Sequence, residues 1–195
     1  QWFDLAPVFT SSEPLLDQTW LYRWFIMRHT LSEPRFGRLQ HPVFYEGRSH
    51  KMSKAQLDPK GWEFSKMIPL TVPMHLLEAR WYRDPVYAHG AMRSMKASQD
   101  EEGFYRCLFV NDTLHSYANF MGWGAYQHYL IHRSTEMLKE LLPSLKAQIR
   151  GEAVKLGNAA DDLLIEYTHN RTGKEYQPSY WYFHHFPKDC KDPST

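Results

Sequence analysis

Cysteine is scarce in this sequence, and neither sign of charge is in excess. The 195 residues include two cysteines, Cys107 and Cys190, which are far apart and form no Cys-x-x-Cys pair. This spacing excludes a zinc ribbon and a disulfide-dense secreted scaffold. Lys and Arg number 23 against 22 Asp and Glu, a formal net charge of +1. Because nucleic-acid-binding domains usually carry a marked basic excess, the balance gives no strong nucleic-acid signal.

Long hydrophobic runs are also missing. The nearest approach, residues 107–131, contains Asp112 and several other polar residues, so we expect burial in protein and not in lipid. No charged region followed by an apolar run marks a secretory signal at the start. The first residue is Gln1, which fits either an incomplete start or the removal of a leader on import into an organelle. We therefore expect no transmembrane helix, and peripheral proximity to a membrane stays open.

The signatures of common catalytic sites are absent as well. The sequence has no glycine-rich phosphate loop, no nucleophile elbow and no Rossmann fingerprint. Lys51-Met52-Ser53-Lys54 resembles the KMSKS loop with which class I aminoacyl-tRNA synthetases hold ATP phosphates. The paired-histidine motif of that family is missing upstream, and Ala55 stands where the family has serine. We interpret the stretch as a solvated basic loop, and we predict no catalytic residues and no cofactor.

What the sequence does contain is apolar and aromatic material for one core. Hydrophobic residues make up 43% and aromatic residues 15%, which fits a single domain over 1–195. Between residues 32 and 73 a proline or glycine recurs too often for a helix or a central strand, yet large apolar side chains persist. This segment is predicted to be an extended arm that needs a surface, either its own helical half or another protein.

Helical periodicity dominates the rest of the chain. Residues 12–31 predict a helix whose stripe of Leu16, Trp20, Trp24 and Met27 is widened by Leu21 and Phe25. A short helix is expected over 74–84. A capping box at 98–101 predicts a helix to about residue 120, followed by helices over 125–142 and, after Pro143, over 144–169. Gly122 and Gly124 are expected to break or kink the chain between the first two of these.

The predicted fold class is therefore mainly α. Residues 1–73 form an N-terminal helix plus the extended, Pro/Gly-punctuated arm, and 74–170 form a helical core with about three long helices. Residues 171–195 form a tail that is first aromatic and then irregular. Cys107 is expected to be a buried thiol because apolar residues follow it.

Histidines offer the best metal candidates. His128, His132 and Glu136 are spaced four residues apart, so they share one face of a helix. Glu136 lies two turns from His128, too far to complete one coordination sphere, and a structural histidine pair is the favoured interpretation. A second group, His184, His185 and Cys190, has no Cys-x-x-Cys partner and is interpreted as part of a packed tail.

The function that these observations favour is that of a non-catalytic accessory subunit of a large multiprotein assembly. Its partners would be other protein subunits of a hetero-oligomeric complex. The residues expected to contact them are Phe36, Phe44, Tyr45, Trp62, Phe64, Trp181 and Phe183.

The expected setting is a mitochondrial respiratory-chain or ATP synthase complex; otherwise the protein is expected to be intracellular and soluble. Leu21-Tyr22-Arg23 is the tripeptide that names the LYR family of small mitochondrial proteins, but the match covers three residues only. Two alternatives stay open. One is a small metal-dependent enzyme that uses the His128/His132 face, and the other is a self-contained module that binds a ligand or peptide.

Overall fold

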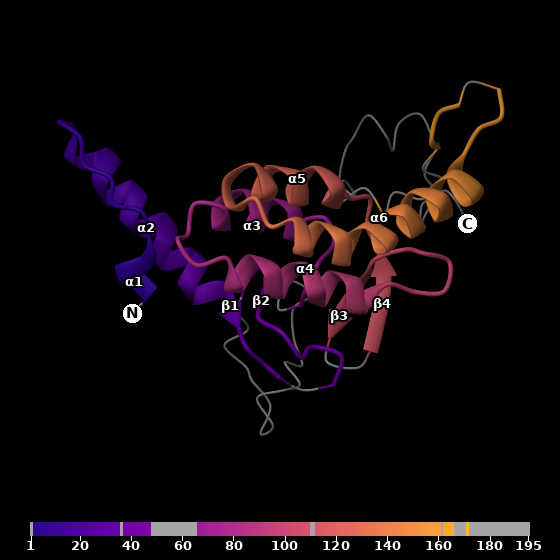
Figure 1. The fold of residues 1–195 in the computed structure, drawn as a ribbon, viewed down its shortest axis with the longest axis horizontal. Helices are drawn as coiled ribbons and strands as arrows, with labels where there is room; N and C mark the ends of the chain where they lie inside the picture. The colour runs from indigo at the N-terminus through magenta and orange to yellow at the C-terminus, as the bar shows by residue number, and fades with distance from the viewer. Residues whose placement is uncertain are drawn as a thin grey trace, which may run out of the picture.

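The fold is mainly α, as predicted (Figure 1). The computed structural model describes residues 2–35, 37–47, 66–109, 112–160, 162–165 and 171. Their helices are α1 (Trp2–Leu5), α2 (Pro14–Thr30), α3 (Val72–Ala79), α4 (Val86–Ser98), α5 (Met121–His132) and α6 (Thr135–Leu156). Their strands form two antiparallel pairs, β1 (Leu31–Ser32) with β2 (Val43–Phe44) and β3 (Arg106–Phe109) with β4 (Asp112–Ser116).

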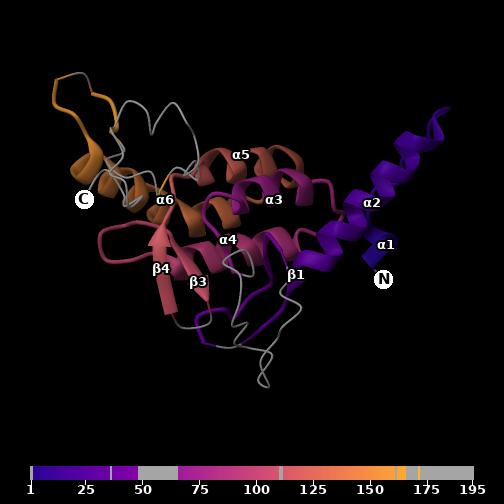
Figure 2. The same cartoon turned by 180° about the vertical axis from the view of Figure 1, so that it is seen from behind.

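Four helices build the body of the molecule. Helix α3 lies beside α5, and both α3 and α5 pack onto the layer that contains α4 and α6 (Figures 1 and 2). The β3–β4 hairpin lies near one end of α4, and β1–β2 lies near the base of α2. Helix α2 projects from the body, with its N-terminal end farthest out in both views. No helix in the described part of the chain combines the length and the apolar character needed to cross a bilayer.

The main core takes residues from both sides of the predicted boundary at residue 73. Leu76 of α3, Met92 of α4 and Leu141 of α6 are fully or almost fully buried, and Leu39 and Val43 of the arm are buried with them. The described flanks of the arm therefore cover the chain's own helices. Residues 48–65, the middle of the arm, lie outside the described residues.

A glycine lets the arm approach helix α4. A Cβ atom on Gly90 would lie 2.7 Å from Cδ and 2.8 Å from the carbonyl oxygen of Pro42. Any side chain at this position would therefore push the arm away from the helix. Nearby, the Ser94 hydroxyl of α4 donates a hydrogen bond of 3.4 Å to the His41 carbonyl. This close contact places β2 against the core.

The prediction of a helix from residue 98 to about residue 120 is wrong. Ser98 ends α4, and its hydroxyl donates to the Met95 carbonyl at 2.7 Å and does not cap a new helix. Asp100 accepts from the Phe104 amide at 2.8 Å, and Gly103 has a φ of 95°, so the chain turns back. The hairpin β3–β4 follows the turn. Cys107 lies on β3 and is buried, as predicted.

Helix α6 explains why the hairpin stays close to the body. The Tyr105 amide donates to Gln148 Oε1 at 2.8 Å, and the Tyr105 hydroxyl lies 2.8 Å from the Ser144 hydroxyl. Ser144, the first residue of the helix predicted over 144–169, lies inside α6 and makes this buried contact. Buried polar groups are stabilising when paired in this way.

The boundaries of the last helices also differ from the prediction. The joint expected at Pro143 is absent, because α6 begins at its N-cap Ser134 and runs through the proline to Leu156. The Ser134 hydroxyl accepts from the Met137 amide at 3.2 Å. Helix α5 includes Gly122 and Gly124, which were expected to interrupt it. Helix α4, which the sequence did not predict, fills the stretch after Pro85.

Candidate functional site

The residues predicted to contact partners divide into two groups. Phe44 is fully buried, pairs with Leu31 across β1–β2, and has its ring centroid 5.6 Å from that of His75. Tyr45 is partly buried and packs on the same core. Both serve the chain's own fold, because the arm closes on its helices. The other five, Phe36, Trp62, Phe64, Trp181 and Phe183, lie outside the described residues.

Helix α2 presents a different candidate surface, which the sequence reasoning missed. Its inner side is fixed to the body by Trp24 and Met27, which are buried. Its other side carries Leu15, Leu21, Tyr22 and Phe25, which are exposed by between 52% and 66%. We call these four side chains the outer face of α2. A surface helix of a folded domain normally has one apolar stripe and a polar opposite side, and α2 has apolar groups on both.

An aromatic cluster holds α2 at its base. The Trp2 indole donates a 3.1 Å hydrogen bond to the Trp24 carbonyl, and its ring stacks on Tyr82 with centroids 4.4 Å apart. The Tyr82 hydroxyl donates to the Trp2 carbonyl at 3.0 Å. Farther along the helix, the Trp20 indole donates to the Pro7 carbonyl at 2.8 Å. The segment before α2 therefore covers the inner side and leaves the outer face uncovered.

The charged residues of α2 flank the outer face. Asp17 lies near the N-terminal end and Arg28 near the C-terminal end. Eleven residues separate them, so at 100° per residue they fall on the same flank of the helix. Asp17 also accepts hydrogen bonds of 2.9 Å from the amide and hydroxyl of Ser11. Arg23 projects elsewhere, into an ion pair with Glu78 of α3. The outer face thus has an acidic and a basic end.

The metal candidates form a histidine cluster in the body. The rings of His128 and His132 stack with centroids 4.4 Å apart and planes 14° from parallel, and His89 of α4 lies edge-on at 5.2 Å from His128. His132 Nε2 lies 2.9 Å from the Arg80 carbonyl. Glu136 is exposed on α6 and is not part of the cluster. Among the described residues, no three His, Cys, Asp or Glu side chains are placed to hold one metal ion.

Burial controls the protonation of this cluster. His128 is 2% exposed, and its Nε2 and that of His89 are buried without a hydrogen-bond partner in the described structure. Burial, followed by repulsion from His132 and His89, lowers the pKa of His128 to about 3. Burial, followed by repulsion from Arg93, also lowers the pKa of His89. Both lowered pKa values keep His128 and His89 neutral at physiological pH, so these two rings serve the packing of the body.

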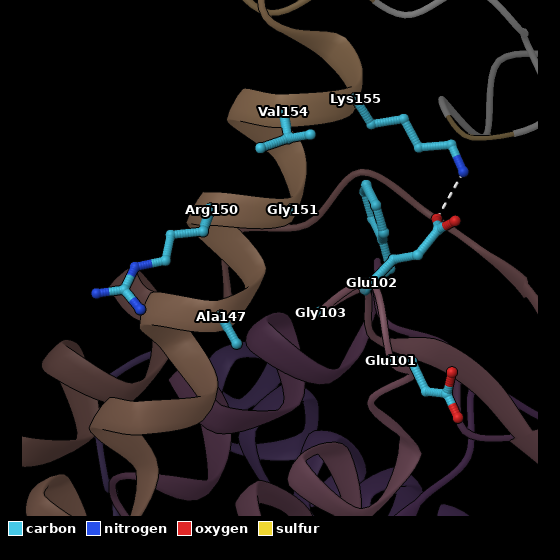
Figure 3. A pocket seen from close by; sticks show the side chains of 9 residues that line it. Glu101, Glu102, Gly103, Ala147, Arg150, Gly151, Val154 and Lys155 are labelled. Atoms are coloured by element: carbon cyan, nitrogen blue, oxygen red, sulfur yellow. Dashed lines mark hydrogen bonds and ion pairs between the residues drawn. The ribbon is translucent and has the colours of Figure 1, made fainter.

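A cavity of about 630 Å³ lies between the turn at 101–104 and helix α6 (Figure 3). The Lys155 ammonium points to the Glu102 carboxylate, 2.5 Å away, whereas Arg150 points away from them. Gly103 lies so close to α6 that a Cβ there would be 2.3 Å from the Ala147 carbonyl oxygen. Because its facing charges are paired with each other, the cavity has no convergent polar set of the kind that orients a ligand.

No family model and no solved structure matches this chain. Support for a function therefore comes from the sequence and from the geometry of the surface and sites. Of the outer face of α2, the histidine cluster and the cavity, the outer face of α2 is the candidate whose burial would be most clearly favourable, because its large apolar side chains are exposed to water.

Proposed function

We propose that this chain is a non-catalytic accessory subunit of a larger multiprotein assembly, and that it contacts a partner through the outer face of α2. The observation that carries the proposal is the second apolar side of a helix that projects from the body (Figures 1 and 2). Tyr22 is 60% exposed and Phe25 52% exposed, and their ring centroids are 6.3 Å apart.

Covering these two side chains would remove apolar surface from water. A buried aromatic side chain removes ~150–250 Å² from water, so Tyr22 and Phe25 together leave roughly 200 Å² to gain. At ~25 cal/mol per Å², covering them alone would favour association by about 5 kcal/mol before the entropic costs of binding. Tyrosine and other large aromatic residues are also the types that dominate interface energetics. An exposed pair on a projecting helix therefore supports a protein contact.

The proposed setting is a mitochondrial respiratory-chain or ATP synthase complex. Its support comes from the sequence: the aromatic and histidine content and the tripeptide Leu21-Tyr22-Arg23. Two residues of that tripeptide, Leu21 and Tyr22, belong to the outer face of α2. The other subunits of the complex would be the hetero-oligomeric partners.

The test uses the full chain, tagged and expressed in the cell from which it derives. Native electrophoresis should place the unmodified chain in a complex far larger than 23.2 kDa, and mass spectrometry should find the same co-migrating subunits in repeated preparations. The double variant Tyr22→Ala/Phe25→Ala should leave that complex and still show the helical circular dichroism of the folded chain.

A matched control removes apolar surface elsewhere. Val154 on α6 is 87% exposed, and Val154→Ala should leave the complex unchanged. If the folded Tyr22→Ala/Phe25→Ala variant migrates with the large complex as well as the unmodified chain does, the outer face of α2 is not the contact. If the unmodified chain migrates alone, the accessory-subunit proposal itself is wrong.

A further inference from the structure

We propose that the helix covering the outer face of α2 is the α2 helix of a second copy of this chain, in antiparallel orientation. The inference rests on the proposed function, since it names the occupant of the same surface. Three features of α2 support a second copy: the spacing of its apolar residues, the order of the charges along its flank, and the space around the helix.

The apolar spacing suits a two-helix seam. Leu15, Tyr22 and His29 recur every seven residues, and Phe25 follows Tyr22 by three, which is the a/d pattern of helices that pack side by side. All four side chains are exposed, and the Phe25 and His29 rings stack with centroids 6.0 Å apart. At ~1.5 Å per residue the 17-residue helix is about 25 Å long, enough for two heptads of contact.

The charges select the orientation. When two α2 helices pack antiparallel about a two-fold axis near Tyr22, residues whose numbers add up to about 44 lie at the same level, and the same flanks meet. Asp17 of one copy then lies within about one residue, ~1.5 Å along the axis, of Arg28 of the other. The two-fold axis repeats the pair, so two opposite-charge contacts form. A parallel pair would instead bring opposite flanks together, so Asp17 and Arg28 would lie on opposite sides of the seam and would gain no partner.

The fold leaves space for the second copy. The body and the segment before α2 lie on the side of Trp20, Trp24 and Met27, and the outer face is on the opposite side. The helix projects from the body in both views (Figures 1 and 2). The body of the second copy would therefore lie on the side of its α2 helix that faces away from the seam. A seam of this length buries less than the ~800 Å² per partner of a standard interface, so we expect a weak and reversible dimer.

The test measures the mass of the purified full chain by analytical ultracentrifugation across a concentration series. We expect a reversible monomer–dimer equilibrium, and Phe25→Ala should abolish dimers over the same range. Asp17→Arg and Arg28→Asp should each weaken the dimer by roughly tenfold, because each replaces two attractions by two repulsions. The double variant Asp17→Arg/Arg28→Asp should restore the dissociation constant to within about threefold of the unmodified value.

Recovery of dimerisation in the double variant would show that each single variant acts through the charge pair and not through damage to the structure. Asp17→Arg also removes the hydrogen bonds from the amide and the hydroxyl of Ser11. Ser11→Ala, which removes the hydroxyl bond, is the control for that side-chain contact, and it should leave dimerisation unchanged. A chain that is monomeric at every concentration, or a double variant weaker than both single variants, overturns the second-copy inference. In either case the native-complex test still decides the proposed function, because loss of the complex in Tyr22→Ala/Phe25→Ala would assign the outer face to a different subunit.

Discussion

Replacing His128 by leucine should flatten the dependence of stability on pH. The folded pKa of about 3 lies below the ordinary value of 6.5, so the unfolded chain takes up the proton first as pH falls. The stability that depends on neutral His128 is fully present above pH 6.5 and is lost as the pH drops toward 3. Because one proton is worth ~1.36 kcal/mol per pH unit, the loss at pH 4.5 is about 2.7 kcal/mol.

The assay is denaturation by urea at pH 7.5 and at pH 4.5, followed by tryptophan fluorescence. Between these two conditions His128→Leu should lose roughly 2.7 kcal/mol less than the unmodified chain. Val154→Leu is the control, because it changes an exposed side chain that carries no titratable proton, and the pH dependence should stay unchanged. If His128→Leu and the unmodified chain lose the same stability on acidification, His128 is not held neutral by burial.

The other predictions concern packing and capping. Gly90→Ala should destabilise the fold by about 1–2 kcal/mol because the new methyl group overlaps Pro42. Gly122→Ala, whose methyl group meets nothing within 4 Å, should be neutral or stabilise the fold by up to ~1 kcal/mol. Thermal unfolding of both variants measures this difference, and equal shifts in melting temperature would contradict it. Ser134→Ala removes the N-cap of α6 and should lower the free energy of unfolding by about 1 kcal/mol, or the melting temperature by ~2–4 °C. Ser134→Asp, which keeps a capping oxygen, should retain the stability of the unmodified chain. Tyr105→Phe should cost about 1 kcal/mol in urea denaturation because the Ser144 hydroxyl loses its buried partner, and no change would show that water replaces the contact.

Local signals in the sequence predicted the mainly α fold and helix α2 to within two residues. These local signals failed where tertiary contacts determine the secondary structure. Ser98 and Glu101 have the spacing of a capping box, but the turn at Gly103 and the bonds from Tyr105 to α6 favour a hairpin. Pro143 predicted a joint, yet Leu141 and Ser144 on either side of it are buried, and their packing stabilises a continuous helix.

The apolar residues of the outer face of α2 are recognisable in the sequence, but the sequence alone led to a different interpretation of them. Leu21 and Phe25 were taken to widen the inner stripe of α2, although both side chains are more than half exposed and the Phe25 ring stacks on Tyr22. The histidine pair was correctly placed on one helical face, and its rings do stack. Its third member, His89, comes from another helix, and no spacing along the chain predicts that contact.

The aromatic cluster of Trp2, Trp24 and Tyr82 has a further consequence for recognition. A 17-residue helix is only marginally stable alone in water, so a free segment would have to fold and orient at the moment of binding. By holding α2 helical and pointing in one direction, the cluster supplies this ordering when the chain folds. The surface is preorganised, and a synthetic peptide with the sequence of α2 should be a much weaker competitor than the intact chain.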